Sequence, residues 1–104
     1  MNYFKSIFIS LALISSNSFA ATDCTTTIDR IWAGDEGYIW FHLNNNGSFK
    51  MSSTDLDQKS ILAMGMTALT TGNSIVVRYD EDNADCTSGN RDDLRGIYLY
   101  GRTL

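Results

Sequence analysis

Side chains that can bind a ligand alternate along one segment of the chain. Residues 38–43 read YIWFHL, and because successive side chains of a β-strand point to opposite faces, Tyr38, Trp40 and His42 share one face. Aromatic rings pack on the C–H faces of sugars while their polar tips form hydrogen bonds, and Trp32, beside the first turn, offers the same chemistry. Aromatic residues also concentrate in protein interfaces. The pattern therefore predicts a glycan-binding surface or a subunit or partner contact.

A loop near the C-terminus carries a second set of candidate ligand-binding residues, within the sequence SGNRDD. Asn90 and Asp92 can hydrogen-bond sugar hydroxyl groups, and Arg91 can hold a sugar carboxylate through two parallel hydrogen bonds. The alternative is structural, with Asp92 and Asp93 pairing with Arg95 or capping a turn.

Catalysis and metal binding find little support. His42 is the only histidine, and no Gly-x-Ser-x-Gly motif supplies a nucleophile for it. The acidic run from Asp80 to Asp85 lacks the glycine and the glutamate of an EF-hand loop. One histidine and two cysteines do not make the usual zinc ligand sets. We expect no catalytic residue, no metal and no cofactor, hence a protein that is not an enzyme.

Composition limits the partners. The chain has 104 residues, with 12 acidic against 8 basic residues and a formal net charge of −4. Proteins held to nucleic acid or anionic lipid by charge need a positive surface, so we expect neither partner. The absence of proline and the 12% of aromatic residues exclude a disordered linker and favour one small domain.

The first twenty residues have the pattern of an export signal. Lys5 precedes the apolar run 7–14, and Ser18-Phe19-Ala20 is a small-x-small cleavage pattern, which places the cut after Ala20. The apolar run would span about 12 Å as a helix, against about 30 Å of membrane hydrocarbon. We expect a signal peptide at 1–20, a domain at 21–104, a secreted or periplasmic location and no membrane insertion.

Two cysteines remain in that domain, Cys24 and Cys86. An oxidising compartment favours their pairing. Their wide separation excludes a local CxxC redox pair, so we predict one structural disulfide.

Alternating polarity and turn signals predict a mainly β domain with one helix. Asn-Gly at 46–47 is a strong hairpin signal, and Gly72 is a natural helix stop after a helix capped by Thr54. The order of three strands, a helix and two strands matches the OB-fold, a five-stranded partly open barrel; a two-layer α+β sheet is the alternative. The predicted strands are 24–33, 38–43, 48–52, 74–80 and 96–100, and the predicted helix is 55–70.

The second half of that helix reads LAMGMTAL over 62–69 and is apolar nearly all round. A surface helix is normally apolar along one stripe only. We therefore expect this helix to be covered on two sides.

The segments QKS at 58–60 and TTGNSIVVRY at 70–79, with the strand order and the two cysteines, resemble the B subunits of bacterial toxins that carry a five-membered binding ring. The similarity is to the cholera/heat-labile and subtilase-cytotoxin groups. It implies a homopentamer with the 55–70 helices packed side by side, and binding of cell-surface glycans. It also implies that Tyr79 lies where the subtilase-type subunits place a sialic-acid-pocket tyrosine. A catalytic A subunit is the family's usual partner, and nothing in this sequence identifies one.

Two functional hypotheses follow. The first is a secreted or periplasmic, non-catalytic, glycan-binding protein resembling toxin B subunits. The second is a monomeric envelope OB-fold protein that binds or inhibits a protein partner through the aromatic face, with its acidic surface setting partner choice.

Overall fold

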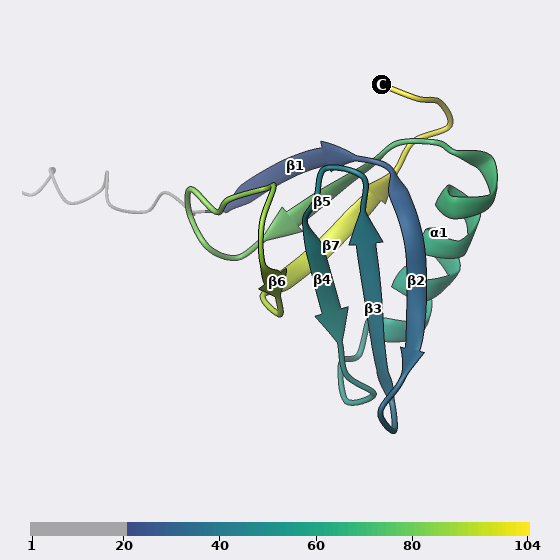
Figure 1. Cartoon of the computed structure of the whole chain (residues 1–104), viewed down its shortest axis with the longest axis vertical. Helices are drawn as coiled ribbons and strands as arrows, with labels where there is room; N and C mark the ends of the chain where they lie inside the picture. The colour runs from purple at the N-terminus through teal and green to yellow at the C-terminus, as the bar shows by residue number, and fades with distance from the viewer. Residues whose placement is uncertain (1–20) are drawn as a thin grey trace, which may run out of the picture.

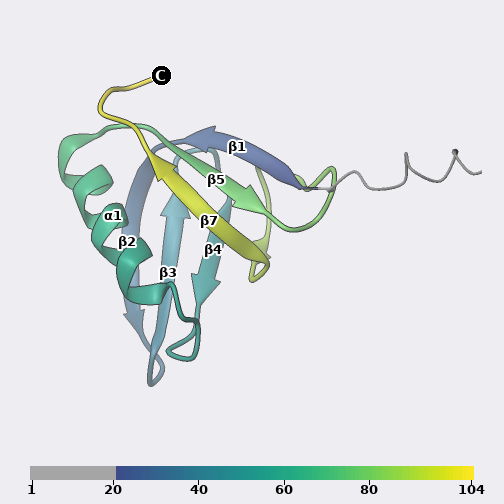
Figure 2. The same ribbon diagram turned by 180° about the vertical axis from the view of Figure 1, so that it is seen from behind.

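The computed structural model describes residues 21–104 as two open β-sheets and one helix (Figures 1 and 2). The signal peptide predicted at 1–20 lies outside the described residues. One sheet has the strand order β1-β5-β7 and the other β2-β3-β4-β6. The elements are β1 Thr22–Thr26, β2 Ile28–Gly34, β3 Tyr38–Leu43, β4 Ser48–Met51, α1 Gln58–Thr71, β5 Ile75–Tyr79, β6 Asn90–Arg91 and β7 Leu94–Leu99.

The strand predicted at 24–33 is two strands, β1 and β2, which belong to different sheets. Thr27 separates them, and Asn44 donates to it twice, through its backbone N–H to the carbonyl oxygen at 3.0 Å and through Nδ2 to Oγ1 at 2.7 Å. β-branched composition indicates extended backbone, but it does not tell which strand will pair with it. The chain therefore changes sheets inside a segment that reads as one strand.

The loop predicted at 80–94 contains a further short strand. β6 pairs in parallel with β4, through Ser48 with Asn90 and Phe49 with Arg91. β7 begins at Leu94, two residues before the predicted start. The β4–β6 pairing joins residues about forty positions apart, where local sequence carries no signal, and the start of β7 is set by the pairing of Leu94 with Tyr79 of β5.

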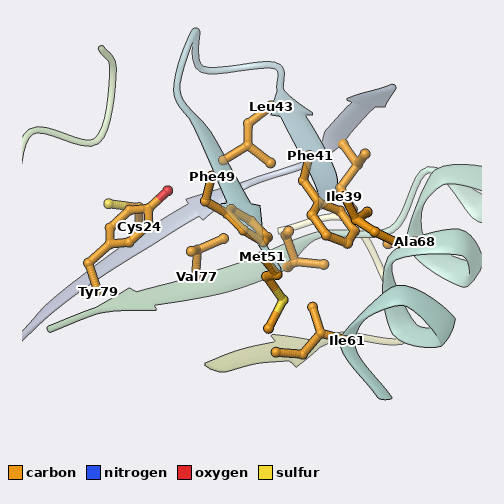
Figure 3. Close-up of a cluster of buried hydrophobic side chains, with 12 residues drawn as sticks. Cys24, Ile39, Phe41, Leu43, Phe49, Met51, Ile61, Ala68, Val77 and Tyr79 are labelled. Atoms are coloured by element: carbon orange, nitrogen blue, oxygen red, sulfur yellow. The ribbon is translucent and has the colours of Figure 1, made fainter. Parts of the chain in front are cut away.

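The core lies between the two sheets (Figure 3). Phe41 and Phe49 of one sheet stack with their ring centroids 4.6 Å apart, and Val77 of the other sheet is fully buried. The alternation expected in 38–43 is confirmed, since Ile39, Phe41 and Leu43, on the face opposite Tyr38, Trp40 and His42, are all buried. The predicted Cys24–Cys86 disulfide is also confirmed, with 5.6 Å between the Cα atoms.

The helix starts later than expected. Asp57, not Thr54, is the N-cap residue of α1, and its side chain makes no capping hydrogen bond. Thr54 lies before the helix, where its backbone N–H donates to Ser52 Oγ at 3.3 Å. The C-terminal stop is confirmed, because Gly72 takes the left-handed conformation with φ 75°.

Within one chain, α1 is covered along one stripe only. Ile61, Gly65 and Ala68 are buried against the sheets, whereas Met66 on the opposite side is 55% exposed. The second covering expected for this helix is not supplied by residues 21–104 of the same chain.

Gly65 sits where the helix approaches β3 most closely. A Cβ at this position would lie 2.6 Å from Cε2 of the fully buried Phe41. Glycine lowers helix propensity by about 1 kcal/mol relative to alanine, but overpacking a core costs about 1–3 kcal/mol. We expect Gly65→Ala to lower the free energy of unfolding by about 1 kcal/mol, measured by urea titration. Gly101→Ala, whose Cβ would meet nothing within 4 Å, is the control; equal stability of the two variants would contradict the close packing.

Candidate functional site

The outward face of β2, β3 and β4 gathers the aromatic candidates. Trp32 of β2 lies directly across from Trp40 of β3, and Trp40 lies across from Lys50 of β4. Cross-strand partners share a face of the sheet, so these side chains form one row. Trp32 is 43% exposed, and Tyr38 flanks the row with an exposed ring of its own. Together with His42 on the same face of β3, the residues Trp32, Tyr38 and Trp40 form what we call the aromatic platform.

Lys50 lies over this platform and was not singled out from the sequence. Its Nζ atom is 5.3 Å from the ring centroid of Tyr38 and 5.4 Å from that of Trp40, within cation–π range. In the described part of the chain, no carboxylate oxygen comes within 4 Å of this ammonium group. Its three donors are therefore available to a ligand resting on the rings. Lys50 could be recognised only from the register between β3 and β4, because their pairing is what places position 50 on the same face as Trp40.

The ring of Trp32 lies against the backbone of Gly34. A Cβ at Gly34 would sit 2.5 Å from Cη2 of Trp32. The absent side chain thus leaves room for the indole of Trp32, which is 43% exposed.

A polar hollow of about 540 Å³ opens at one end of the platform. His42 links the two, because its ring stacks on that of Trp40 with centroids 6.3 Å apart and planes 16° apart. Hydroxyl, amide and charged groups line the hollow, so it suits a hydrogen-bonding ligand. Its lining residues are Asp29, Arg30, His42, Leu43, Asn44, Asn46, Gly47, Ser48, Gly89 and Asn90.

Asn90 reaches this hollow because the 80–94 segment is anchored beside β4. Ser48 Oγ bonds to Asn90 Oδ1 and also donates to the carbonyl oxygen of Gly89 at 3.2 Å. A Cβ at Gly47 would lie 2.6 Å from the carbonyl oxygen of Cys86, so only glycine allows the disulfide-bearing segment to approach so closely. The disulfide and the β4–β6 pairing together set the position of Asn90.

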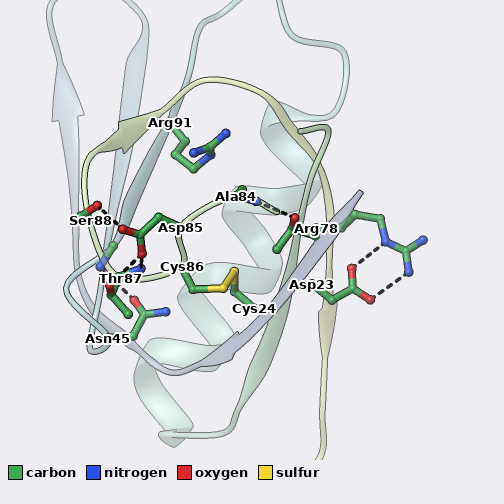
Figure 4. The surroundings of a disulfide bond; sticks show 12 residues. Asp23, Cys24, Asn45, Arg78, Ala84, Asp85, Cys86, Thr87, Ser88 and Arg91 are labelled. Atoms are coloured by element: carbon green, nitrogen blue, oxygen red, sulfur yellow. Dashed lines mark hydrogen bonds and ion pairs between the residues drawn. A yellow bond between two sulfur atoms is a disulfide. The ribbon is translucent and has the colours of Figure 1, made fainter. Parts of the chain in front are cut away.

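The turn after the disulfide is held by one carboxylate (Figure 4). Asp85 accepts hydrogen bonds from the backbone N–H of Thr87 at 2.9 Å, from Thr87 Oγ1 at 2.8 Å and from Ser88 Oγ at 2.8 Å. These bonds, the backbone one first, lower the pKa of Asp85 below its ordinary value. The carboxylate therefore stays ionised and holds the turn that leads to Asn90.

Arg91 faces away from the hollow and is held by the protein's own carboxylates. Its Nε and Nη2 donate to Asp93 at 3.0 and 2.9 Å, and Nη2 donates to Glu81 at 2.6 Å. Its guanidinium carbon lies 4.9 Å from the ring centroid of Tyr79, and its side chain is only 17% exposed. The hydrogen bonds from Arg91 lower the pKa of the Asp93 carboxyl. Arg91 thus joins the two ends of the 80–94 segment. Asp93 pairs with Arg91, and not with Arg95 as the structural alternative expected.

Asp92 lies at the other end of the platform. It lines a shallow hollow of about 230 Å³ together with Tyr38, Lys50, Ser52 and Asp55. Asn90 and Asp92 therefore flank the aromatic platform from opposite ends, although only Arg91 separates them in sequence.

Tyr79 does not belong to this surface. It is 1% exposed and packs edge-on against Phe49, with ring centroids 6.5 Å apart. Burial raises the pKa of Tyr79 to about 12, partly offset by the nearby Arg91 guanidinium. The resemblance placed Tyr79 in a sugar pocket, whereas the structure makes it part of the core, in line with its alternation with Ile75 and Val77.

The buried phenol makes stability depend on alkaline pH. An unfolded tyrosine ionises near pH 10, so between about pH 10 and 12 the unfolded chain has released this proton while the folded chain retains it. The free energy of unfolding therefore falls with rising pH over this window, by about 2 kcal/mol. We expect Tyr79→Phe to flatten this dependence, measured by urea titration at successive pH values. A wild-type slope that persists unchanged in the variant would assign the effect to other groups.

The described residues thus form a mainly β domain with one helix, one disulfide and an aromatic, polar-flanked surface. Comparison with protein-family models and with curated proteins finds no match to this chain. In residues 21–104, no helix has the length and apolar character needed to cross a membrane. The same residues contain no cluster of three or more His, Cys, Asp or Glu side chains arranged to hold a metal ion.

Proposed function

We propose that this protein is a secreted or periplasmic, non-catalytic binding protein whose aromatic platform holds a glycan. The observation that carries the proposal is the row formed by Trp32, Trp40 and Lys50 between two polar hollows. Indole faces bind the apolar faces of sugar rings, while the flanking amides, hydroxyls and charges bind sugar hydroxyl groups. No chemical step is required of any of these residues.

The dimensions of the surface favour more than one sugar ring. The hollow of about 540 Å³ at Asn90 and the hollow of about 230 Å³ at Asp92 lie at opposite ends of the platform. A chain of sugars lying along β3 over Trp40 would place hydroxyl groups in both hollows at once. We therefore propose an oligosaccharide rather than a monosaccharide as the ligand.

The finer fold assignment is part of the proposal. A partly open OB-fold barrel is supported by the single residue, Thr27, that joins β1 and β2 across the two sheets, and by a core enclosed between those sheets. It also agrees with a helix lying between β4 and β5 in the chain. This order underlies the proposed relation to toxin B subunits.

Assembly into a pentamer through α1 is supported by an uncharged exposed helix face. The sequence from 60 to 71 contains no charged residue. Met66 and Leu69 are exposed, and the hydroxyl groups of Thr67, Thr70 and Thr71 donate to carbonyl oxygens of their own helix. Such a face turns sulfur and methyl groups outward and hides its polar atoms, as expected of a subunit contact.

The assembly proposal has a direct test. We expect light scattering to give a mass about five times that of one chain, and Met66→Lys to give monomers, because a charge at a packed helix face costs several kcal/mol. Leu56→Lys, at a fully exposed leucine outside α1, is the control and should leave the mass unchanged. A monomeric wild-type protein would overturn the pentamer but leave the aromatic platform to be tested by itself.

The glycan proposal is tested by screening the oxidised protein on a glycan array. Saturable binding to a defined set of oligosaccharides supports it. No binding by folded protein, together with capture of a protein partner that is lost in Trp40→Ala, would favour the alternative of an envelope protein that binds or inhibits another protein.

A further inference from the structure

The sheet opposite the platform carries a second polar surface, on the outward side of β1, β5 and β7. Asp23 of β1, Arg78 of β5 and Gly96 of β7 form one cross-strand row. Tyr98 follows on the same face of β7 and is 53% exposed. Figure 2 shows β7 nearest the viewer, with the platform sheet behind it.

A β-bulge brings Arg95 to this row. The β5–β7 ladder pairs Arg78 with Gly96 and then Tyr79 with Leu94, so Arg95 is the extra residue in β7. Bulges turn a side chain away from the face that alternation would give it, and they occur often beside functional sites. Arg95 consequently lines two adjoining hollows, of about 260 and 450 Å³, and Arg78 lines both as well.

Gly96 leaves the floor between the arginines open. A Cβ at this position would meet nothing within 4 Å, and its φ lies outside the positive range, so neither packing nor backbone geometry calls for glycine. Glycine weakens the interior of a strand and often marks close approach of a ligand. The missing side chain therefore leaves open space beside the bulge, which a ligand can enter.

Arg78 and Arg95 differ in how many of their guanidinium donors form hydrogen bonds within the protein. Arg78 donates from Nε to Asp23 Oδ1 at 2.7 Å and from Nη2 to Oδ2 at 3.0 Å (Figure 4), and its carbon lies 5.9 Å from the Tyr98 ring centroid. This pair fixes the Arg78 plane. Arg95 has only Asp80 near it, at 3.8 Å, which is too long for a hydrogen bond. Across 21–104, its donors make no hydrogen bond to another residue.

We propose that Arg95 and Arg78 bind an oxyanion, a carboxylate or sulfate group carried by a small molecule, above Gly96 and against the Tyr98 ring. Guanidinium groups match such oxyanions through paired hydrogen bonds. Asp23 holds Arg78 in place, and Arg95 supplies the donors that the protein itself leaves free. Because the chain is acidic, with a formal net charge of −4, a long polyanion is repelled and a single anionic group is favoured.

The site is tested by titrating the oxidised protein separately with acetate and with sulfate, at constant ionic strength in chloride. NMR follows the Gly96 amide and the side-chain Nε–H of Arg95. We expect saturable shifts at both positions, with Arg102, an arginine stacked on Tyr100 beyond β7, unchanged as the internal control. Saturation with acetate identifies a carboxylate ligand, and saturation with sulfate identifies a sulfate or phosphate ester; either supports the site.

Two variants make the test specific. Gly96→Val fills the open floor, where a Cβ meets no atom within 4 Å. Arg95→Gln removes the charge and the guanidinium group while keeping a polar amide. Each should weaken anion binding at least about tenfold. The disulfide and the urea midpoint should be unchanged in both. Shifts that rise linearly, that are equal at Arg102, or that survive Gly96→Val would overturn the proposal. The glycan platform lies on the other sheet, so failure of either proposal leaves the other standing.

Discussion

Trp40→Ala is expected to weaken glycan binding about thirtyfold while leaving the fold intact. Trp40 is the centre of the platform, paired across strands with Trp32, stacked on His42 and lying under the Lys50 ammonium. Removing it takes away the largest apolar contact and also the support that orients its neighbours. Central aromatic anchors of this kind are worth about 2 kcal/mol or more, which is a loss of affinity of about thirtyfold.

The measurement is isothermal titration calorimetry with the strongest oligosaccharide from the array. Because Trp40 is on the solvent face, opposite the buried Phe41, the urea midpoint of the variant should stay close to wild type. Tyr98→Ala is the matched control, an exposed aromatic residue on the other sheet, and it should retain glycan binding. Equal losses in the two variants would show that the aromatic platform is not the binding surface.

Loss of the disulfide is expected to have the largest effect on stability. Cys24 and Cys86 are 62 residues apart in sequence, and a loop of that length constrains the unfolded chain by about 4 kcal/mol. A domain of this size has a total stability of about 5–10 kcal/mol. The double variant Cys24→Ala/Cys86→Ala should therefore be unfolded in a substantial fraction of molecules at 37 °C, or lose most of its resistance to urea.

The same bond positions part of the candidate site. Cys86 packs against Gly47, and the segment that follows delivers Asn90 to the polar hollow. Any double variant that remains folded should therefore show raised mobility at Asn90 in NMR relaxation and weaker glycan binding. The control is wild-type protein treated with a reductant, which should match the variant. A variant within about 1 kcal/mol of wild type would mean that the β4–β6 pairing alone holds the segment.

Local sequence determined the elements that have a clear period and clear ends. The alternation in 38–43 identified both faces of β3, and Gly72 marked the end of α1. The helix start was misplaced because Thr54 and Asp57 are both acceptable N-cap residues, and local propensity does not choose between them. The disulfide could be predicted because only two cysteines remain in 21–104.

Some residues of the candidate site could likewise be found from local sequence, and others depend on tertiary structure. Trp32, Tyr38, Trp40 and His42 could be found from the sequence because each lies on the outward face of a period-two pattern or beside a turn. Lys50 was missed because its place depends on the register between β3 and β4. Tyr79 carries the same phenol as the exposed tyrosines, and only burial against Phe49 distinguishes it.

The sequence by itself therefore determined the mainly β class, the disulfide pairing and the aromatic face. Tertiary structure alone decided that β1 and β2 separate at Thr27, that Asn90 pairs beside Ser48, and that Arg91 binds Asp93 and Glu81 instead of facing a ligand. The physical reason is the distance along the sequence over which each interaction acts. Propensity, alternation and capping act within a few residues, whereas strand pairing and ion pairs join groups that are brought together only when the whole chain packs.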